Sequence, residues 1–409
     1  MRGSGAAPGT PDSLVRSKAF AYITVADFLV RSAYQMGKTP LLPIFAAALG
    51  AEAALLGFIV SVSTLTGMVL KPFIGVLSDR WGRRGWLILG TVFFALMPFL
   101  YRFVETPDQL FALRIVHGLA TAIYGPVTLA YVAELSRQRR AERMAWFGLA
   151  RNGGYIVGPA VAGWMLLSMD PVSVFTIIGL VSSLAFLPIL LLPESRGRAT
   201  RQHGPLLPEA VRALVSGGKT PAVWLAGGLE GTMYVVLYAT KAFLPLFALS
   251  VGFNVAVAGT FFAVQEAAHL ALNPIGGRLG DRFGYLTTVP AGMVVLAAAL
   301  PLLTLVEGVA YLMGVAVLMG AAQALVFPST LALVSNSVGD RNLATGLGLL
   351  GTLKNGGKVA GPAIGGLMVH WLDYDLTFQL MAAALLASAI VVRLRPGLIR
   401  RSRRGPVPA

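Results

Sequence analysis

GVLSDRWG at residues 75–82 returns 202 residues later as GRLGDRFG at residues 277–284. Three more segments return at nearly the same interval. LPIFA at 42–46 matches LPLFA at 244–248, PVTLA at 126–130 matches PSTLA at 328–332, and RNGGYIVGPAVAG at 151–163 matches KNGGKVAGPAIGG at 354–366. Four matches at nearly one interval predict that the chain is built from two similar halves in the same orientation.

The composition places these halves in a membrane. Hydrophobic residues make up 56% of the 409 residues and charged residues only 12%, about half the charged fraction of a soluble domain. Apolar runs of the length that spans a bilayer recur along the chain, and in lipid such a run must be helical to satisfy its own backbone. We therefore predict an all-α membrane protein with twelve transmembrane helices in two parallel six-helix repeats. The expected divisions are a disordered N-terminus (1–19), an N-terminal half (20–193), a linker (194–221), a C-terminal half (222–393) and a basic tail (394–409).

The loops between the runs carry the charge that sets orientation. The formal net charge is +15, and Lys and Arg gather in alternate loops, which predicts that those loops and both termini are cytoplasmic. We expect a multi-pass protein of the inner (plasma) membrane, in contact with lipids and not with nucleic acid. The basic loops are explained by topology alone, although binding of anionic lipid stays open.

Several chemistries are excluded. The chain has no cysteine, so it has no disulfide scaffold and no thiol nucleophile. Its four histidines show no metal-ligand spacing, and no Gly-x-x-x-x-Gly-Lys-Ser/Thr loop for ATP is present. We expect neither an enzyme nor a bound cofactor or metal.

GVLSDRWGRR at 75–84 resembles the loop between helices two and three of the major facilitator superfamily, and the resemblance extends over about 20–393. It implies two halves that move around a small-molecule substrate held between them, in a protein that we expect to be monomeric. Gly75 is expected to allow close helix approach and Gly82 a tight turn. The predicted cytoplasmic gate comprises Gly75, Asp79, Arg80, Gly82, Arg83, Glu134, Arg137, Asp281 and Arg282.

Two further motifs carry the resemblance. RIVHG at 114–118 resembles the family's Arg-x-x-x-Gly motif of helix four, whose arginine is linked to proton transfer in proton-coupled members. GGYIVGPAVAG at 153–163 resembles the Gly-Pro signature of the drug:proton antiporter branch, although here the second half carries it too. The predicted helix-packing motif is Gly154, Gly158, Pro159, Gly361 and Pro362, and ordinary packing of small residues is the alternative.

Charges inside spans are costly and mark functional hypotheses. Asp27 and Glu230 occupy nearly equivalent places in the two halves, as do Lys38 and Lys241. The resemblance places their helices on the central cavity. Proton-coupling candidates are Asp27, Glu230, Arg114, Glu266 and His269, and the predicted substrate cavity contains Arg31, Tyr34, Lys38, Tyr234, Tyr238, Lys241 and Lys358.

Some roles stay open. Asp27 lies four residues before Arg31, so the two are either a static ion pair or part of the transport path. By depth along the helix, Arg114 is expected to face Gln35 or Lys38 rather than Asp27.

The preferred function is proton-coupled export of small amphipathic molecules by alternating access. One alternative keeps the fold and uses Lys38 and Lys241 to bind an organic anion, a phosphate ester or a lipid. A membrane receptor without transport is the less favoured third possibility, because the two-half architecture is typical of transporters.

Overall fold

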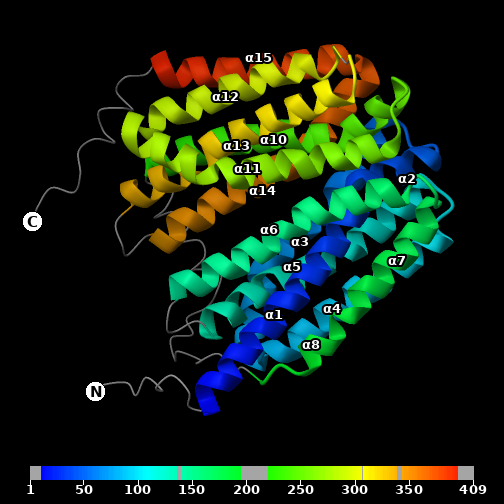
Figure 1. The fold of residues 1–409 in the computed structure, drawn as a ribbon, viewed down its shortest axis with the longest axis vertical. Helices are drawn as coiled ribbons and strands as arrows, with labels where there is room; N and C mark the ends of the chain where they lie inside the picture. Colours follow the sequence, from blue (N-terminus) through cyan, green and yellow to red (C-terminus); the bar gives the residue numbers. More distant parts are fainter. Residues whose placement is uncertain (1–10, 136–139, 195–219, 306, 339–342, 395–409) are drawn as a thin grey trace, which may run out of the picture. The chain divides into compact units, whose positions relative to one another are not determined.

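The computed structural model describes residues 11–135, 140–194, 220–305, 307–338 and 343–394, and these residues form helices joined by short connections. Most of the predicted linker, most of the basic tail, the first ten residues and Arg137 lie outside the described residues. The predicted all-α membrane fold is confirmed for the described chain (Figure 1).

The first half of the chain forms a series of helices that correspond to six predicted spans. In order these are α1 (Pro11–Met36) with the π-helical turn η1 (Gly37–Leu41) and α2 (Leu42–Ala48), α3 (Ala53–Trp81), α4 (Arg83–Leu100) with η2 (Tyr101–Phe103), α5 (Pro107–Leu135), α6 (Arg140–Met165), and α7 (Pro171–Leu184) with α8 (Phe186–Leu190).

The second half repeats this series. It consists of α10 (Pro221–Ser250), α11 (Val255–Phe283), α12 (Tyr285–Leu302), α13 (Val309–Ser337), α14 (Leu343–Trp371) and α15 (Tyr374–Leu394). The contacts divide the described chain into two compact units. Unit 1 takes the described residues within Met1–Gly50 and Val62–Arg201, and unit 2 takes those within Ala51–Ser61 and Gln202–Ala409.

Nine of the described helical segments are long and apolar enough to cross a bilayer by length and composition alone. The long helices α1, α6 and α14 are not among the nine, and they carry the intramembrane charges Asp27, Arg151 and Lys354. Each of the three has at least 26 residues, which is enough to cross the hydrocarbon layer. The charges therefore lower the hydropathy of helices that still have spanning length.

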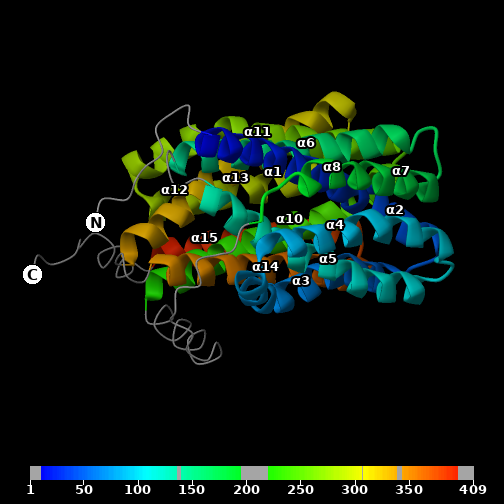
Figure 2. The same cartoon turned by 90° about the horizontal axis from the view of Figure 1, so that it is seen from below.

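The helices pack in equivalent pairs in the two units. In unit 1, α1 packs on α6, and α4 packs on both α5 and α7. In unit 2, α10 packs on α14, and α12 packs on both α13 and α15. The unit 2 pairs can be followed in Figures 1 and 2. The sequence repeat is thus also a repeat of helix packing.

The first span is broken where the sequence shows only one apolar run. Thr39 has extended backbone angles (φ −149°, ψ 124°) inside the turn that joins α1 to α2. Pro40 explains the break, because a proline cannot donate to the helix ladder and disfavours helical angles in the residue before it.

Glycines in the repeated loop and in the helix-packing motif have different roles. Gly82 and Gly284 have positive φ values of 88° and 87°, so both halves turn sharply between their second and third helices at a residue without Cβ. At Gly75, by contrast, no described atom lies within 4 Å of where a Cβ would stand. The close approach expected at Gly75 is therefore not found among the described residues.

Gly154 and Gly158 of α6 lie directly against α1. A Cβ at Gly158 would stand 2.8 Å from the carbonyl oxygen of Ser32 and 2.9 Å from the amide nitrogen of Met36. Gly361 of α14 lies equally close to the backbone of α10, where its Cβ would stand 3.1 Å from the Cα of Val235. Small residues let these backbones approach closely.

Replacing Gly158 with alanine is expected to destabilise the protein by about 1–3 kcal/mol, because the added methyl group meets backbone atoms that cannot rotate away. Gly148→Ala on the same helix is the matched control, since no described atom lies within 4 Å of its Cβ position. Unfolding midpoints in mild detergent titrated with sodium dodecyl sulfate measure both. Equal midpoints for the two variants would contradict the close packing of α6 on α1.

The residue before α7 shows how the start of a spanning helix is stabilised. The Asp170 carboxylate caps α7 by accepting hydrogen bonds from the Ser173 hydroxyl at 2.5 Å and the Ser173 amide at 3.0 Å. These bonds favour the ionised form, so they lower the pKa of Asp170. The capped carboxylate is exposed at the start of α7.

Candidate functional site

Asp27 lies in the middle of α1 and is 1% exposed. Arg151 of α6 holds it in a two-bond ion pair, with Nε and Nη2 each 3.0 Å from one carboxylate oxygen. Arg31, the partner that the sequence pattern indicates, is more distant at 3.9 Å. The ring of Phe147 lies 5.2 Å from the Arg151 guanidinium and fixes it further. Asp27 is therefore a carboxylate held between two arginines.

Glu230 occupies the equivalent place on α10 and is 3% exposed. Its Oε2 accepts a hydrogen bond of 2.7 Å from the Thr330 hydroxyl, and its Oε1 lies 3.6 Å from Lys354 Nζ. The Lys354 side chain is 35% exposed, whereas that of Arg151 is 16% exposed. Unit 1 thus holds its acid with a forked ion pair, whereas unit 2 holds its acid with a hydroxyl hydrogen bond and a longer, more accessible ion pair.

An aromatic and cationic surface lies beside Glu230. The Tyr234 ring stacks on Phe327 with centroids 4.8 Å apart. The ammonium groups of Lys354 and Lys358 lie 5.1 Å and 4.7 Å from the Tyr234 centroid. Such stacking and cation–π contacts form a surface that suits flat, partly charged molecules.

Glu266 and His269 belong to the same region of unit 2. His269 Nδ1 lies 3.3 Å from Glu266 Oε1, and the His269 ring packs edge-on against Phe327 with centroids 5.4 Å apart. Lys241 lies over the Tyr238 ring at 5.4 Å and interacts electrostatically with Glu266. The unit 2 residues predicted for coupling and for the cavity therefore gather in one cluster.

In unit 1 the predicted cavity residues gather near the end of α1. Lys38 Nζ donates to the Thr64 hydroxyl at 3.1 Å and lies 5.8 Å from the centre of the Tyr34 ring. Lys71 of α3 also interacts electrostatically with Arg31 and Lys38. Lys71 is not among the predicted cavity residues, although a lysine inside an apolar run is a visible signal of a functional position.

Arg114 is 2% exposed and does not join the carboxylates of either unit among the described residues. Its guanidinium donates to the Ser63 hydroxyl and, at 3.3 Å, to the Tyr101 hydroxyl. These partners replace the Gln35 and Lys38 contacts expected from depth along the helix. Tyr101 also lies 3.0 Å from His117 Nδ1, so His117 belongs to a buried polar cluster.

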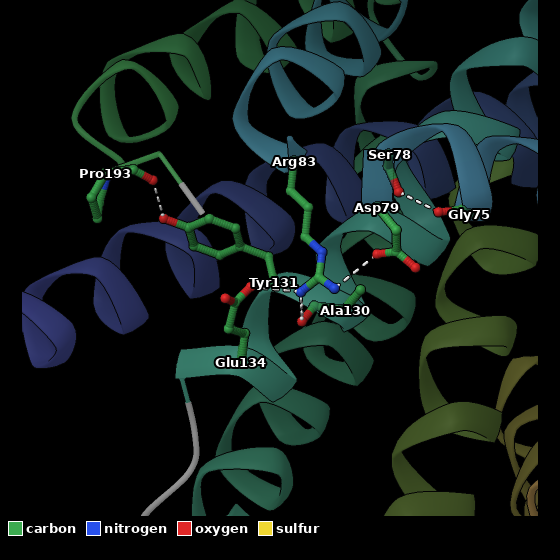
Figure 3. Close-up of polar contacts among 8 residues, drawn as sticks. All are labelled: Gly75, Ser78, Asp79, Arg83, Ala130, Tyr131, Glu134 and Pro193. Carbon is green, nitrogen blue, oxygen red and sulfur yellow. Dashed lines mark hydrogen bonds and ion pairs between the residues drawn. The ribbon is translucent and has the colours of Figure 1, made fainter. Parts of the chain in front are cut away.

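At the opposite end of unit 1, three predicted gate residues, Asp79, Arg83 and Glu134, lie together (Figure 3). Arg83 donates to Asp79 at 2.9 Å, to Glu134 at 2.8 Å and to the carbonyl oxygen of Ala130 at 2.7 Å. One arginine therefore ties the start of α4 to the ends of α3 and α5. Arg80 is exposed at this end.

The second half keeps the geometry of this cluster and changes its chemistry. Asp281 accepts a hydrogen bond of 2.8 Å from the Tyr285 hydroxyl, which in turn accepts one of 3.1 Å from Asn336. Tyr285 and Asn336 stand 202 residues after Arg83 and Glu134. The neighbouring Arg282 lies over the ring of Phe283 at 5.2 Å. A two-bridge ionic cluster in unit 1 thus has a largely neutral counterpart in unit 2.

The fold and the buried charges together define a helical membrane transporter built from two repeated units. The family model described as Major Facilitator Superfamily matches residues 28–264 and 223–408. The chain belongs to the major facilitator superfamily.

Relatives of known function extend over most of the chain. Multidrug resistance protein 1 of Bacillus subtilis is 22% identical over 349 residues, covering 83% of this chain and 86% of its own length. Quinolone resistance protein NorA of Staphylococcus aureus is 23% identical over 369 residues, covering 86% of this chain and 90% of its own. These proteins support membership of the drug transporter branch of the family.

Solved structures show the same fold. The nucleoside transporter NupG superposes with a TM-score of 0.80 at 15% identity, covering 92% of this chain and 98% of its own. A bacterial homologue of the human lysosomal transporter Spinster superposes with a TM-score of 0.77 at 16% identity, covering 98% of this chain and all of its own.

Proposed function

We propose that this protein is a proton-coupled exporter of small amphipathic molecules and that Glu230 is the residue that takes up and releases the proton. The observation that carries the proposal is the contact of Glu230 with one partly exposed lysine at 3.6 Å inside a membrane-spanning helix. A carboxylate held this way can exchange its ionic partner for a proton, and Lys354 can then turn to solvent.

Asp27 has a different role in this proposal. Its two bonds from Arg151 and the nearby charge of Arg31 hold the carboxylate in a buried ion pair. Asp27 therefore ties α1 to α6, while Glu230 couples the proton to movement. Transport by two repeated halves that alternate around a central site follows the general scheme for such architectures.

The substrate surface that we assign is the stacked pair Tyr234 and Phe327 with the lysines around it. Stacking and cation–π contacts accept flat apolar molecules of varied shape. The similarity to a multidrug resistance protein and a quinolone resistance protein supports export of such molecules. We assign the Asp79–Arg83–Glu134 cluster to the cytoplasmic gate, since it joins the ends of three helices through one arginine.

The balance of intramembrane charge favours a second candidate, export of amphipathic anions. Among the described residues in the span interiors of unit 1, the cations outnumber the acids: Arg31, Lys38, Lys71, Arg114 and Arg151 stand against Asp27. In unit 2, Lys241, Lys354 and Lys358 stand against Glu230 and Glu266. An excess of positive charge in the span interiors attracts anions and repels cations.

Orientation and assembly complete the proposal. We propose that both termini lie in the cytoplasm and the protein in the plasma membrane, which the loops rich in Lys and Arg support. We propose that the monomer is the transporting form, because each chain already contains both repeated units.

Flux into proteoliposomes under an imposed pH gradient tests the function and both substrate classes. We expect accumulation of a fluorescent amphipathic dye against its gradient, and collapse of that accumulation when a protonophore is added. Comparing an anionic dye with a cationic dye of similar size decides between the two candidates. Dye movement that ignores the pH gradient for every probe would contradict proton coupling.

A further inference from the structure

Unit 1 contains a small cavity between α1, α4, α5 and α7 that the proposed transport mechanism does not use. Its volume is about 10 Å³, close to the least space that holds one water molecule. The polar side chains on its wall are Tyr34, Tyr101, Arg114, His117 and Ser182, and the rest of the lining is apolar. Such a polar cluster in an apolar wall needs its hydrogen bonds completed.

The hydrogen-bond roles in this cluster can be assigned from one tyrosine. The Tyr101 hydroxyl oxygen accepts a bond from Arg114 Nη1 at 3.3 Å and lies 3.0 Å from His117 Nδ1. Its own hydrogen is satisfied if it donates to His117 Nδ1. The neutral imidazole then carries its proton on Nε2, because only one ring nitrogen accepts.

Three polar atoms of the cluster are buried without a hydrogen-bond partner among the described residues. They are Arg114 Nε, His117 Nε2 and Ser182 Oγ, and all three residues line the cavity. The first two are donors by the assignment above, and the hydroxyl can donate as well. The cluster therefore offers unused donors rather than unused acceptors.

The positive charge of Arg114 also favours a ligand that accepts hydrogen bonds. Arg114 is 2% exposed, and the ionisable groups that act on it are Tyr101 and Tyr34 rather than a carboxylate in the described part of the chain. A buried guanidinium without an anion is strongly disfavoured. A water molecule would complete hydrogen bonds but would leave this charge uncompensated.

We propose that the cavity binds a small monatomic anion of the halide type, such as chloride. An anion accepts from Arg114, His117 and Ser182 and compensates the guanidinium charge. The site holds α5 against α4 and α7 within unit 1, so its occupancy stabilises the unit. This inference goes beyond the proposed export function and does not depend on it.

Thermal unfolding of the purified full-length protein tests the proposal in neutral detergent at fixed pH and ionic strength. Replacing gluconate with chloride or bromide should raise the melting temperature by about 5 °C in a saturable way, since a ligand of the native state stabilises it. Ser182→Ala removes one donor from a small side chain and should raise the halide concentration for half-saturation several-fold. Arg102→Gln, at an exposed arginine, is the matched control and should respond like the original chain.

Anomalous scattering from crystals grown in bromide gives a second, direct measurement. A peak among Arg114, His117 and Ser182 would support the proposal without relying on any variant. Melting that is the same in gluconate and halide, or a halide response that Ser182→Ala and Arg102→Gln share equally, would overturn it. Because neither measurement uses a membrane gradient, a failure here is distinguishable from a failure of proton-coupled export.

Discussion

Glu230→Gln is expected to abolish uphill transport driven by a pH gradient while leaving a folded protein that still exchanges substrate. Glutamine keeps the size of the side chain and its hydrogen bond with Thr330 but cannot release a proton. Lys354 loses its carboxylate, yet its side chain is 35% exposed and can be solvated instead. The expected loss of stability is therefore only about 1 kcal/mol.

Two measurements on one preparation of Glu230→Gln separate coupling from folding. Accumulation of dye in proteoliposomes should fall to the level of empty liposomes, whereas exchange of labelled for unlabelled dye across the membrane should continue. Glu307→Gln is the matched control, because Glu307 is an exposed glutamate in the loop between α12 and α13. Uphill accumulation by Glu230→Gln equal to that of the control would refute the proton-carrying role.

Asp27→Asn is expected to lose much more stability than Glu230→Gln, with a loss of about 3–5 kcal/mol. The substitution leaves Arg151 and Arg31 without their shared carboxylate, and these side chains are only 16% and 15% exposed. Breaking a buried ion pair on one side is costly because the remaining charge is neither paired nor hydrated.

The double variant Asp27→Asn, Arg151→Gln provides the control, since it removes a charge from each side of the pair. It should recover much of the stability, which unfolding midpoints in detergent report. A single Asp27→Asn variant as stable as Glu230→Gln would show that the two acids are equivalent. The division between a structural ion pair and a proton carrier would then be wrong.

The sequence alone determined the architecture. Apolar runs long enough to cross a bilayer can only be helices in lipid, and the repeat of GVLSDRWG as GRLGDRFG indicates two equivalent halves. Both are local properties of the chain or comparisons of the chain with itself. The same repeat paired Asp27 with Glu230 and Arg151 with Lys354 as equivalent positions, and the structure places each acid beside its own cation.

The tertiary structure decided which side chains meet. The spacing of four residues favours Arg31 as the partner of Asp27, but α6 brings Arg151, 124 residues away, to 3.0 Å. Helical periodicity shows which residues share a face of one helix, and it carries no information on the helix packed against that face. Close approach of α6 to α1 at Gly158 sets that partner.

The difference between the two halves also became visible only in three dimensions. Tyr285 and Asn336 are unremarkable in the sequence, yet they occupy the places of Arg83 and Glu134 and join the same helices through neutral hydrogen bonds. Likewise, Arg114 and His117 lie one helical turn apart in the sequence, but Tyr101 and Ser182 reach them from other segments. The sequence determines which chemical groups each position carries. Packing between distant helices determines which of those groups share a site, because burying a charge or a polar group without a partner is energetically costly.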